Sequence, residues 1–157
     1  MATVLAPPPV QNVVVSPARL IDKKWVKWLL DVTTRLQKTS QVFRVESLSN
    51  QAAAIAATPL PVGALAAGLY RLSYYLRVTT PASGTSSVTF TAGSTESGVN
   101  VTQSGPALTS NTTTTAQSGA FLLQADQAAA LTYSTAYDST GATAMQYRLT
   151  VLLEGVD

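Results

Sequence analysis

The segment from Leu69 to Thr80 constrains the fold of this chain more than any other stretch. Every second side chain from Tyr70 to Val78 is apolar, while the positions between them are mostly polar. This alternation predicts a β-strand with one buried face and one solvent-exposed face. Turn-forming Pro, Gly and Ser residues flank the segment on both sides. We therefore expect it to be the central strand of an antiparallel β-domain.

Further strand-forming segments follow one another at spacings of about ten residues, which is typical of a sandwich or a barrel. The alanine-rich run 51–58 fits either a short helix or a strand, and the prolines after it favour a strand. We predict an all-β fold over residues 41–157, an antiparallel two-sheet sandwich of eight or nine strands that resembles a jelly roll. The other predicted strands are 41–48, 86–92, 99–104, 108–116, 120–125, 129–137 and 144–151, the last continuing towards Leu153.

The first 15 residues form an apolar arm in which Pro7–Pro9 favour an extended path. Its valines suit pairing with the edge of a β-sheet in another protein. One interpretation is therefore a docking arm that becomes ordered on a partner, and the other is a flexible tail. The valines that we assign to docking are Val13, Val14 and Val15.

Residues 16–40 are predicted to form one amphipathic helix, since Ser16 and Pro17 are typical of a helix start. Apolar residues then recur at spacings of three and four, which places them on one face. This face either packs against the chain's own sandwich or docks onto a neighbouring subunit. The residues of the face, which we assign to assembly, are Ile21, Trp25, Trp28, Leu29, Val32 and Leu36.

Charge is distributed unevenly along the chain. Residues 1–38 contain six basic and two acidic residues, a net charge of +4, whereas no Lys or Arg occurs between Arg77 and Arg148. The basic residues of the helix lie on its polar face without alternating with aromatic residues, so they favour a solvated surface over a nucleic-acid interface.

The composition leaves little catalytic chemistry. The chain has no Cys and no His, which removes thiolate nucleophiles and the commonest general base and metal ligand. We expect no cofactor, no metal site, no enzymatic activity and no membrane-spanning segment. A glycosidase needs only two carboxylates close in space, and Asp126 with Asp138 is the pair we considered. Their alternative role, as turn residues that bond to nearby backbone, fits the sequence better.

Several runs resemble a family of small virion structural proteins of tailed, podovirus-like bacteriophages and prophages. The similar parts are residues 60–79, residues 103–119 and the upstream helix with Trp25 and Trp28. The resemblance implies a structural role in the virion, assembled in the bacterial cytoplasm. The expected protein is a tail-associated fibre or spike subunit, a homotrimer anchored to other virion proteins through its N-terminal arm and helix.

Two other functions remain open. The first is a capsid decoration or cement protein that stabilises the head by bridging coat subunits. The second is a module that binds carbohydrate on the host surface, with Tyr75, Tyr133 and Tyr137 as candidate platforms for sugar rings. Packing in the core is the competing role for each of these tyrosines.

Overall fold

The computed structural model of the chain describes residues 23–37, 42–109 and 111–156. The chain divides into two compact units, Met1–Gln41 and Val42–Asp157, and each is described by itself.

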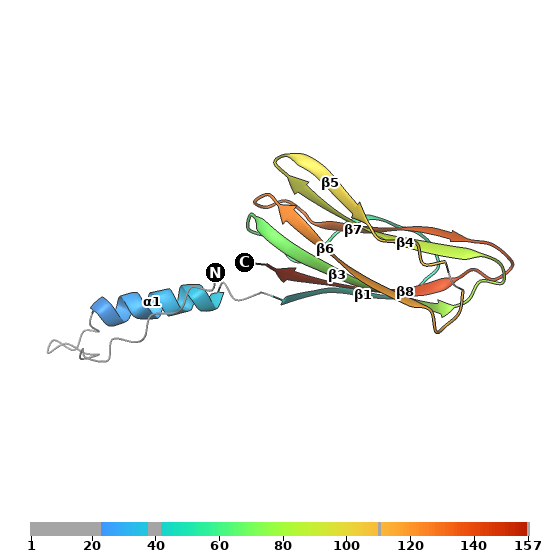
Figure 1. The fold of residues 1–157 in the computed structure, drawn as a ribbon, viewed down its shortest axis with the longest axis horizontal. Coiled ribbons are helices and arrows are strands. Elements are labelled where there is room, and N and C mark those ends of the chain that lie inside the picture. Colours follow the sequence, from blue (N-terminus) through green and yellow to red (C-terminus); the bar gives the residue numbers. More distant parts are fainter. Residues whose placement is uncertain (1–22, 38–41, 110, 157) are drawn as a thin grey trace. The chain divides into compact units, whose positions relative to one another are not determined.

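The first unit contains helix α1 (Lys23–Gln37) (Figure 1). The side chains of Trp25, Trp28 and Val32 recur at helical spacing and are half-buried. The hydroxyl of Thr33 donates to the carbonyl of Leu29 one turn earlier, at 2.8 Å. The prediction of a helix over residues 16–40 thus holds for α1, and residues 16–22 and 38–40 lie outside the described residues.

The second unit is built from strands that are connected by turns and loops (Figure 1). Among its described residues they number eight: β1 (Val42–Gln51), β2 (Ile55–Pro59), β3 (Gly68–Thr80), β4 (Ser86–Glu96), β5 (Val99–Ser104), β6 (Ala116–Ala125), β7 (Thr132–Ser139) and β8 (Gln146–Gly155).

The strands pair as in one long antiparallel β-hairpin that is folded over on itself. β1 pairs with β8, β2 with β7, β3 with β6 and β4 with β5, and all four pairs are antiparallel. This folding brings β8 next to β3 and β7 next to β4. The result is two four-stranded sheets, the β3 sheet in the order β1-β8-β3-β6 and the β4 sheet in the order β2-β7-β4-β5. This is the strand order of a jelly roll, so the predicted fold class is confirmed.

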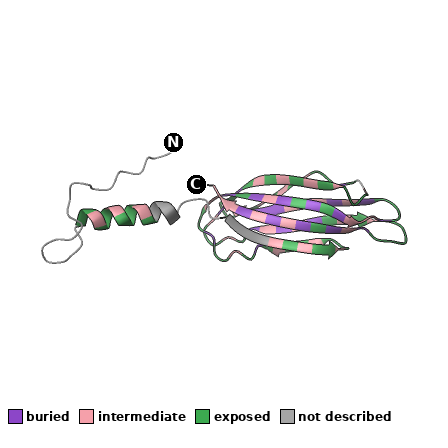
Figure 2. Cartoon of the chain, turned by 90° about the horizontal axis from the view of Figure 1, so that it is seen from below, coloured by how far each residue is buried: buried purple, intermediate pink, exposed green. Residues whose placement is uncertain are grey.

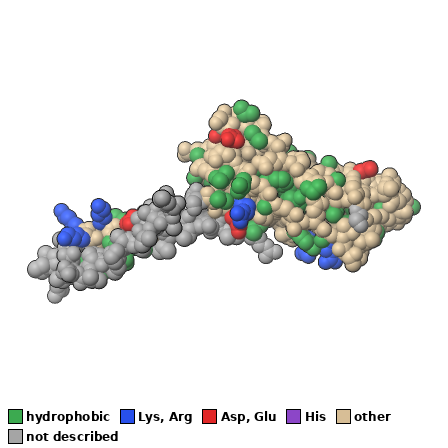
Figure 3. Space-filling model, in the orientation of Figure 1, with side chains coloured by type: hydrophobic (Ala, Val, Ile, Leu, Met, Phe, Trp, Pro, Cys, Tyr) green, Lys and Arg blue, Asp and Glu red, His purple; other side chains and the backbone are tan. Residues whose placement is uncertain are grey.

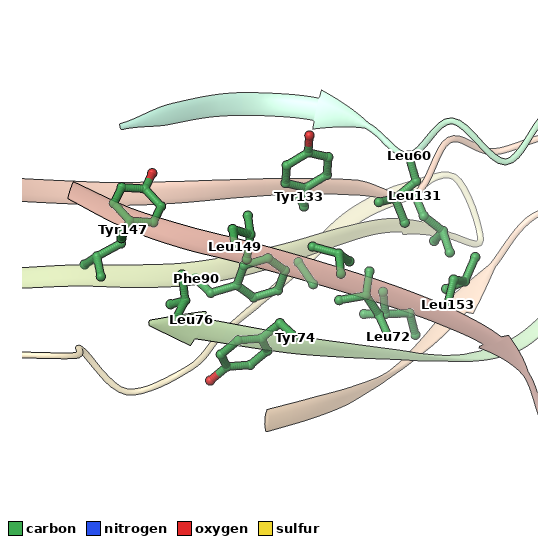
Figure 4. Close-up of a cluster of buried hydrophobic side chains, with 14 of the residues drawn as sticks. Leu60, Leu72, Tyr74, Leu76, Phe90, Leu131, Tyr133, Tyr147, Leu149 and Leu153 are labelled. Carbon is green, nitrogen blue, oxygen red and sulfur yellow. The ribbon is translucent and has the colours of Figure 1, made fainter. Parts of the chain in front are cut away.

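Residues of the central strands alternate between buried and exposed (Figure 2), and the buried side chains fill the space between the sheets (Figure 4). The parity predicted from the Leu69–Thr80 segment is confirmed, because its apolar positions point inward and Arg71, Tyr75 and Arg77 are exposed. Each fully buried Leu or Val contributes about 1.5–3 kcal/mol to the unfolding free energy. Those of β3 and β8 with no exposed surface are Leu72, Leu76, Val78, Leu149, Val151 and Leu153.

An aromatic stack joins the two sheets near β6. The ring of Tyr74 lies 4.4 Å from that of Phe90 and 5.7 Å from that of Phe121, measured between centroids, and both pairs are nearly parallel. Two glycines make room for the tyrosine. A Cβ atom at Gly119 would lie 2.7 Å from Cε1 of Tyr74, and one at Gly105 would overlap the tyrosine hydroxyl.

A chain of hydrogen bonds ties the start of β2 to both sheets. The amide of Ile55 donates to Oγ1 of Thr135 at 2.9 Å, and this hydroxyl lies 2.7 Å from that of Tyr147. The Tyr147 hydroxyl in turn donates to the carbonyl of Ala53 at 2.8 Å. Burial raises the pKa of Tyr147, and the bond with Thr135 opposes part of that shift. Burial and, second, the nearby carboxylate of Glu46 raise the pKa of Tyr133.

The prediction of a strand over residues 108–116 is wrong. Leu108 forms only an isolated bridge to β4, and residues 112–115 form a turn. The cause is the side chain of Asn111, which accepts from the amide of Ala82 and donates to its carbonyl, both at 2.7 Å. These bonds hold the segment as a loop against the β3–β4 connection. The strand predicted over residues 51–58 is confirmed only for 55–58, which belong to β2. Gln51 is the last residue of β1, and residues 52–54 lie between the two strands.

Replacing Gly119 with Ala should lower the unfolding free energy by about 1–3 kcal/mol, because the added methyl group forces the Tyr74 ring out of its stack. Urea unfolding measures the change. Ala120→Val on the same strand, where the side chain is exposed, is the matched control and should stay within about 0.5 kcal/mol of wild type. A Gly119→Ala protein of wild-type stability would show that the ring is not held in place.

Removing the hydroxyl of Tyr147 by substitution with Phe should lower the unfolding free energy at neutral pH by about 1–3 kcal/mol, since Thr135 and Ala53 lose a buried partner. A tyrosine whose pKa is raised on folding stabilises the fold fully below its unfolded pKa of about 10 and loses this contribution as pH rises through the folded pKa. Urea unfolding at pH 7 to 11 should therefore show a weaker alkaline decline for Tyr147→Phe.

The exposed Tyr75 provides the control for that substitution. Tyr75→Phe should leave the neutral-pH stability unchanged, because its ring is 40% exposed. Equal effects at the two positions would contradict the role given to the buried hydroxyl.

Candidate assembly surfaces

The predicted assembly residues fall on both sides of the boundary of the described part. Val13, Val14, Val15 and Ile21 lie outside the described residues, and so does the side chain of Leu36. The structure places the remaining four on α1, namely Trp25, Trp28, Leu29 and Val32.

On α1 the two tryptophan rings contact each other edge to face, with 5.6 Å between centroids. Leu29, in the same stripe, is 45% exposed. Lys23, Lys24 and Lys27 are exposed along the helix as well. The helix therefore combines an aromatic and aliphatic stripe with a basic polar side, which is the composition of a surface that can bury apolar area against a partner.

Open strand edges are the second class of candidate surface, because an edge presents unpaired backbone groups to other chains. Three of the four edges carry recognised protection. β1 has two irregularities in its register with β8 and carries the charged Glu46. β2 is short, irregular in register and ends at Pro59. β5 has only six residues and is followed by Gly105 and Pro106.

The edge strand β6 lacks these protections. Its ten residues contain no charge and no proline, and its register with β3 is regular from Gly68↔Ala125 to Arg77↔Ala116. Leu122 is 52% exposed, and Ala116 and Ala120 are exposed on the same parity. The side chain of Gln103 donates to the carbonyl of Leu122 at 2.7 Å, which covers one backbone acceptor. We call this strand edge the β6 edge.

The surface of the strand unit is poor in charge. In the view of Figure 3 few of its side chains are charged, and polar uncharged groups and backbone cover most of it, with hydrophobic side chains between them. This agrees with the charged fraction of 11% in the whole chain. A surface of this kind depends on hydroxyl and amide groups for its contacts with water and with partners.

The three tyrosines that are candidate platforms for sugar rings differ in exposure. Tyr75 is 40% exposed on the outer face of β3, whereas Tyr133 is 4% exposed and belongs to the core. Tyr137 is half-buried and donates from its hydroxyl to the carbonyl of Met145 at 2.7 Å. The core role that the sequence suggested for each of the three is therefore wrong for Tyr75, the one of them with an exposed ring.

Asp126 and Asp138 do not form a carboxylate pair. The carboxylate of Asp126 accepts from the amides of Ser97 and Gly98 at 3.0 and 2.8 Å, which fixes the β4–β5 turn. The amide of Asp126 donates to the carbonyl of Thr95 on β4, whereas Asp138 is the register partner of Ser87 on β4. Thr95 and Ser87 are eight residues apart along this strand, or about 26 Å. The two aspartates beside them are therefore too far apart for a glycosidase, which needs its carboxylates within about 10 Å. Asp126 thus bonds to turn backbone, but in a turn 28 and 29 residues away in sequence. The turn role is wrong for Asp138, which lies within β7.

Within the part of the chain that the structure describes, no group of three or more His, Cys, Asp or Glu residues is placed to hold a metal ion. The helix found there is too short and too polar to cross a membrane. The chain matches no protein-family model, and no curated protein matches it either.

Proposed function

We propose that this chain is a structural subunit of a bacteriophage particle, a tail-associated fibre or spike protein anchored through its N-terminal unit. The observation that carries the proposal is the combination of an eight-stranded jelly roll with a separate N-terminal helix that has an aromatic, partly exposed stripe. Jelly rolls recur in viral capsid proteins and lectins, which gives the proposal a basis in fold analogy. The resemblance of residues 60–79 and 103–119 to virion proteins, which lies in fold and composition signatures, is a second support.

The division into two units fits this role. A subunit that is displayed on a particle needs one part that attaches and another that folds on its own core. The Val42–Asp157 unit has such a core, since Tyr147, Phe90 and Leu72 are fully buried within it. α1 supplies the kind of apolar stripe that attachment requires.

Self-association through the β6 edge completes the proposal, with a second and third copy of this chain as its occupants. Ten uncharged residues produce no charge repulsion between identical copies. In a trimer each copy turns its β6 edge toward the shared axis and buries Leu122 there. The other three edges are protected, which favours β6 as the edge that copies share.

Leu122→Lys should weaken self-association at least about tenfold, because identical copies then bring like charges together at the interface. Sedimentation velocity over a range of concentrations measures the change. The control is Val99→Lys, which also replaces an exposed aliphatic residue but on β5, and it should associate as wild type does. A wild-type protein that is monomeric at all concentrations would refute self-association, and a dimer would indicate pairing of two β6 strands about a two-fold axis.

Leu29→Lys in α1 should reduce incorporation into phage particles several-fold, since Lys keeps the helix but places a charge in its apolar stripe. Quantitative immunoblotting of purified particles measures incorporation. Lys27→Gln, an exposed position on the polar side of the same helix, is the control and should be incorporated normally.

Gold-labelled antibodies against residues 42–157 locate the protein on intact particles. Label at the tail vertex is the expected result. Label spread over the head would replace the fibre or spike role with decoration of the capsid, and no label on any particle would refute a virion role.

A further inference from the structure

The outer face of the β3 sheet carries two arginines in directly opposite positions. Arg77 of β3 and Arg148 of β8 are register partners, and both side chains are exposed. Like charges directly across a strand pair destabilise a sheet. Among the described residues neither arginine forms an ion pair, whereas Arg71 on the same strand lies 3.9 Å from the carboxylate of Glu154. The fold therefore compensates one exposed arginine and leaves the opposed pair uncompensated.

A second irregularity lies beside the first. The register between β3 and β8 shifts between Val78 and Thr80, so Thr79 is an extra residue in the strand. Its hydroxyl is the one buried side-chain polar atom, in the described part of the chain, that lacks a hydrogen-bond partner. Such register shifts are common next to functional sites.

A row of hydroxyl groups crosses the sheet next to the arginine pair. Ser118 of β6, Tyr75 of β3, Thr150 of β8 and Ser47 of β1 are consecutive register partners across all four strands. Ser118, Tyr75 and Ser47 are exposed, and Thr150 is half-buried. Three strand spacings make the row about 14 Å long. We call Tyr75, Thr150 and Ser47, together with Arg77 and Arg148, the Tyr75 site, and Ser118 belongs to the β6 edge.

Features that lower stability thus gather at one end of the β3–β8 pair, whose register is otherwise regular. Proteins depart from local folding rules chiefly where function requires it. We infer that the Tyr75 site binds an acidic saccharide, a sugar chain that carries carboxylate or sulfate groups. The inference rests on the proposed function for its biological meaning, because a displayed fibre subunit would use such a site on the host surface.

The chemistry of the site matches this ligand at each position. The guanidinium fork of Arg77 or Arg148 binds a carboxylate or a sulfate through two parallel hydrogen bonds. The exposed ring of Tyr75 offers an apolar face for a sugar ring and a hydroxyl at its edge. The flanking serine and threonine hydroxyls donate and accept, as the many hydroxyls of a saccharide require.

Nucleic acid fits the site less well. Proteins hold a phosphate backbone with an extended track of basic residues. At the Tyr75 site the positive charge comes from one pair of arginines, and Arg71, farther along the same face of β3, is paired with Glu154. One arginine pair among uncharged hydroxyl groups fits a ligand that is polar and carries its negative charge at separate groups.

The Tyr75 site lies far along β8 from Val42, the first residue of the strand unit. Val42 is the register partner of Glu154, and Arg148 is six residues from Glu154 along the strand, or about 20 Å.

Binding of the full-length protein to immobilised polysaccharides tests the inference. Polygalacturonate carries carboxylates, dextran sulfate carries sulfates, and dextran is the uncharged reference. We expect binding to at least one acidic polymer and none to dextran, with preference between the two identifying the anionic group. Arg77→Gln and Arg148→Gln should each weaken binding about tenfold or more, and Tyr75→Ala several-fold.

The matched control is Arg71→Gln, which removes an exposed arginine from the same face of the same strand and should leave binding unchanged. Thermal unfolding guards against a folding artefact, since Arg77→Gln relieves the like-charge pair and should leave the melting temperature equal or higher. Failure to bind either acidic polymer, an equal loss in Arg71→Gln, or tighter binding to a DNA duplex than to both polymers would overturn the inference. These binding measurements use the isolated protein, whereas the virion proposal is tested on phage particles, so either proposal can fail without the other.

Discussion

The burial of alternate side chains from β3 and β8 between the two sheets is the constraint on which the rest of this structure depends. Leu72, Leu76, Leu149 and Leu153 have no exposed surface. A slip of one residue would turn these leucines outward and bring arginines into the core, so the register is strongly determined. The same alternation that builds the core therefore places Tyr75, among the outward-facing residues, on the surface. The inward residues of β3 thus form the core, and the outward residues of the same strand form the proposed binding face.

The sequence predicts the elements whose pattern is local and strong. The alternation of residues 69–80 and of the last strand is regular, and both appear where expected. Strand order could not be predicted, because the pairing of β1 with β8 joins residues about 100 positions apart. The error at 108–116 has a different origin. Threonines there suit a strand, but the hydrogen bonds of Asn111 to Ala82 hold the segment as a loop.

Some of the candidate surfaces could likewise be predicted from local sequence patterns, and others depend on strand order and register. The stripe of α1 follows from helical spacing alone, and the exposed position of Tyr75 follows from the parity of its strand. The β6 edge was missed, since a strand is an edge only by virtue of the order of the whole sheet. The sequence shows that residues 116–125 carry no charge, but this property indicates an association surface only once the strand is known to be an edge. The opposition of Arg77 and Arg148 is likewise a property of register, which connects residues 71 positions apart.

The position of β8 also has a consequence for synthesis. β8 leaves the ribosome after the other seven strands of this unit, yet it lies in the middle of the β3 sheet, between β1 and β3. A nascent chain that ends before Gln146 has no partner to place between those strands, so they cannot form a continuous sheet. A domain made of successive hairpins can begin to fold during translation, but this one must wait for its final segment. Until then its apolar strands and their edges are exposed, which favours aggregation with other nascent chains.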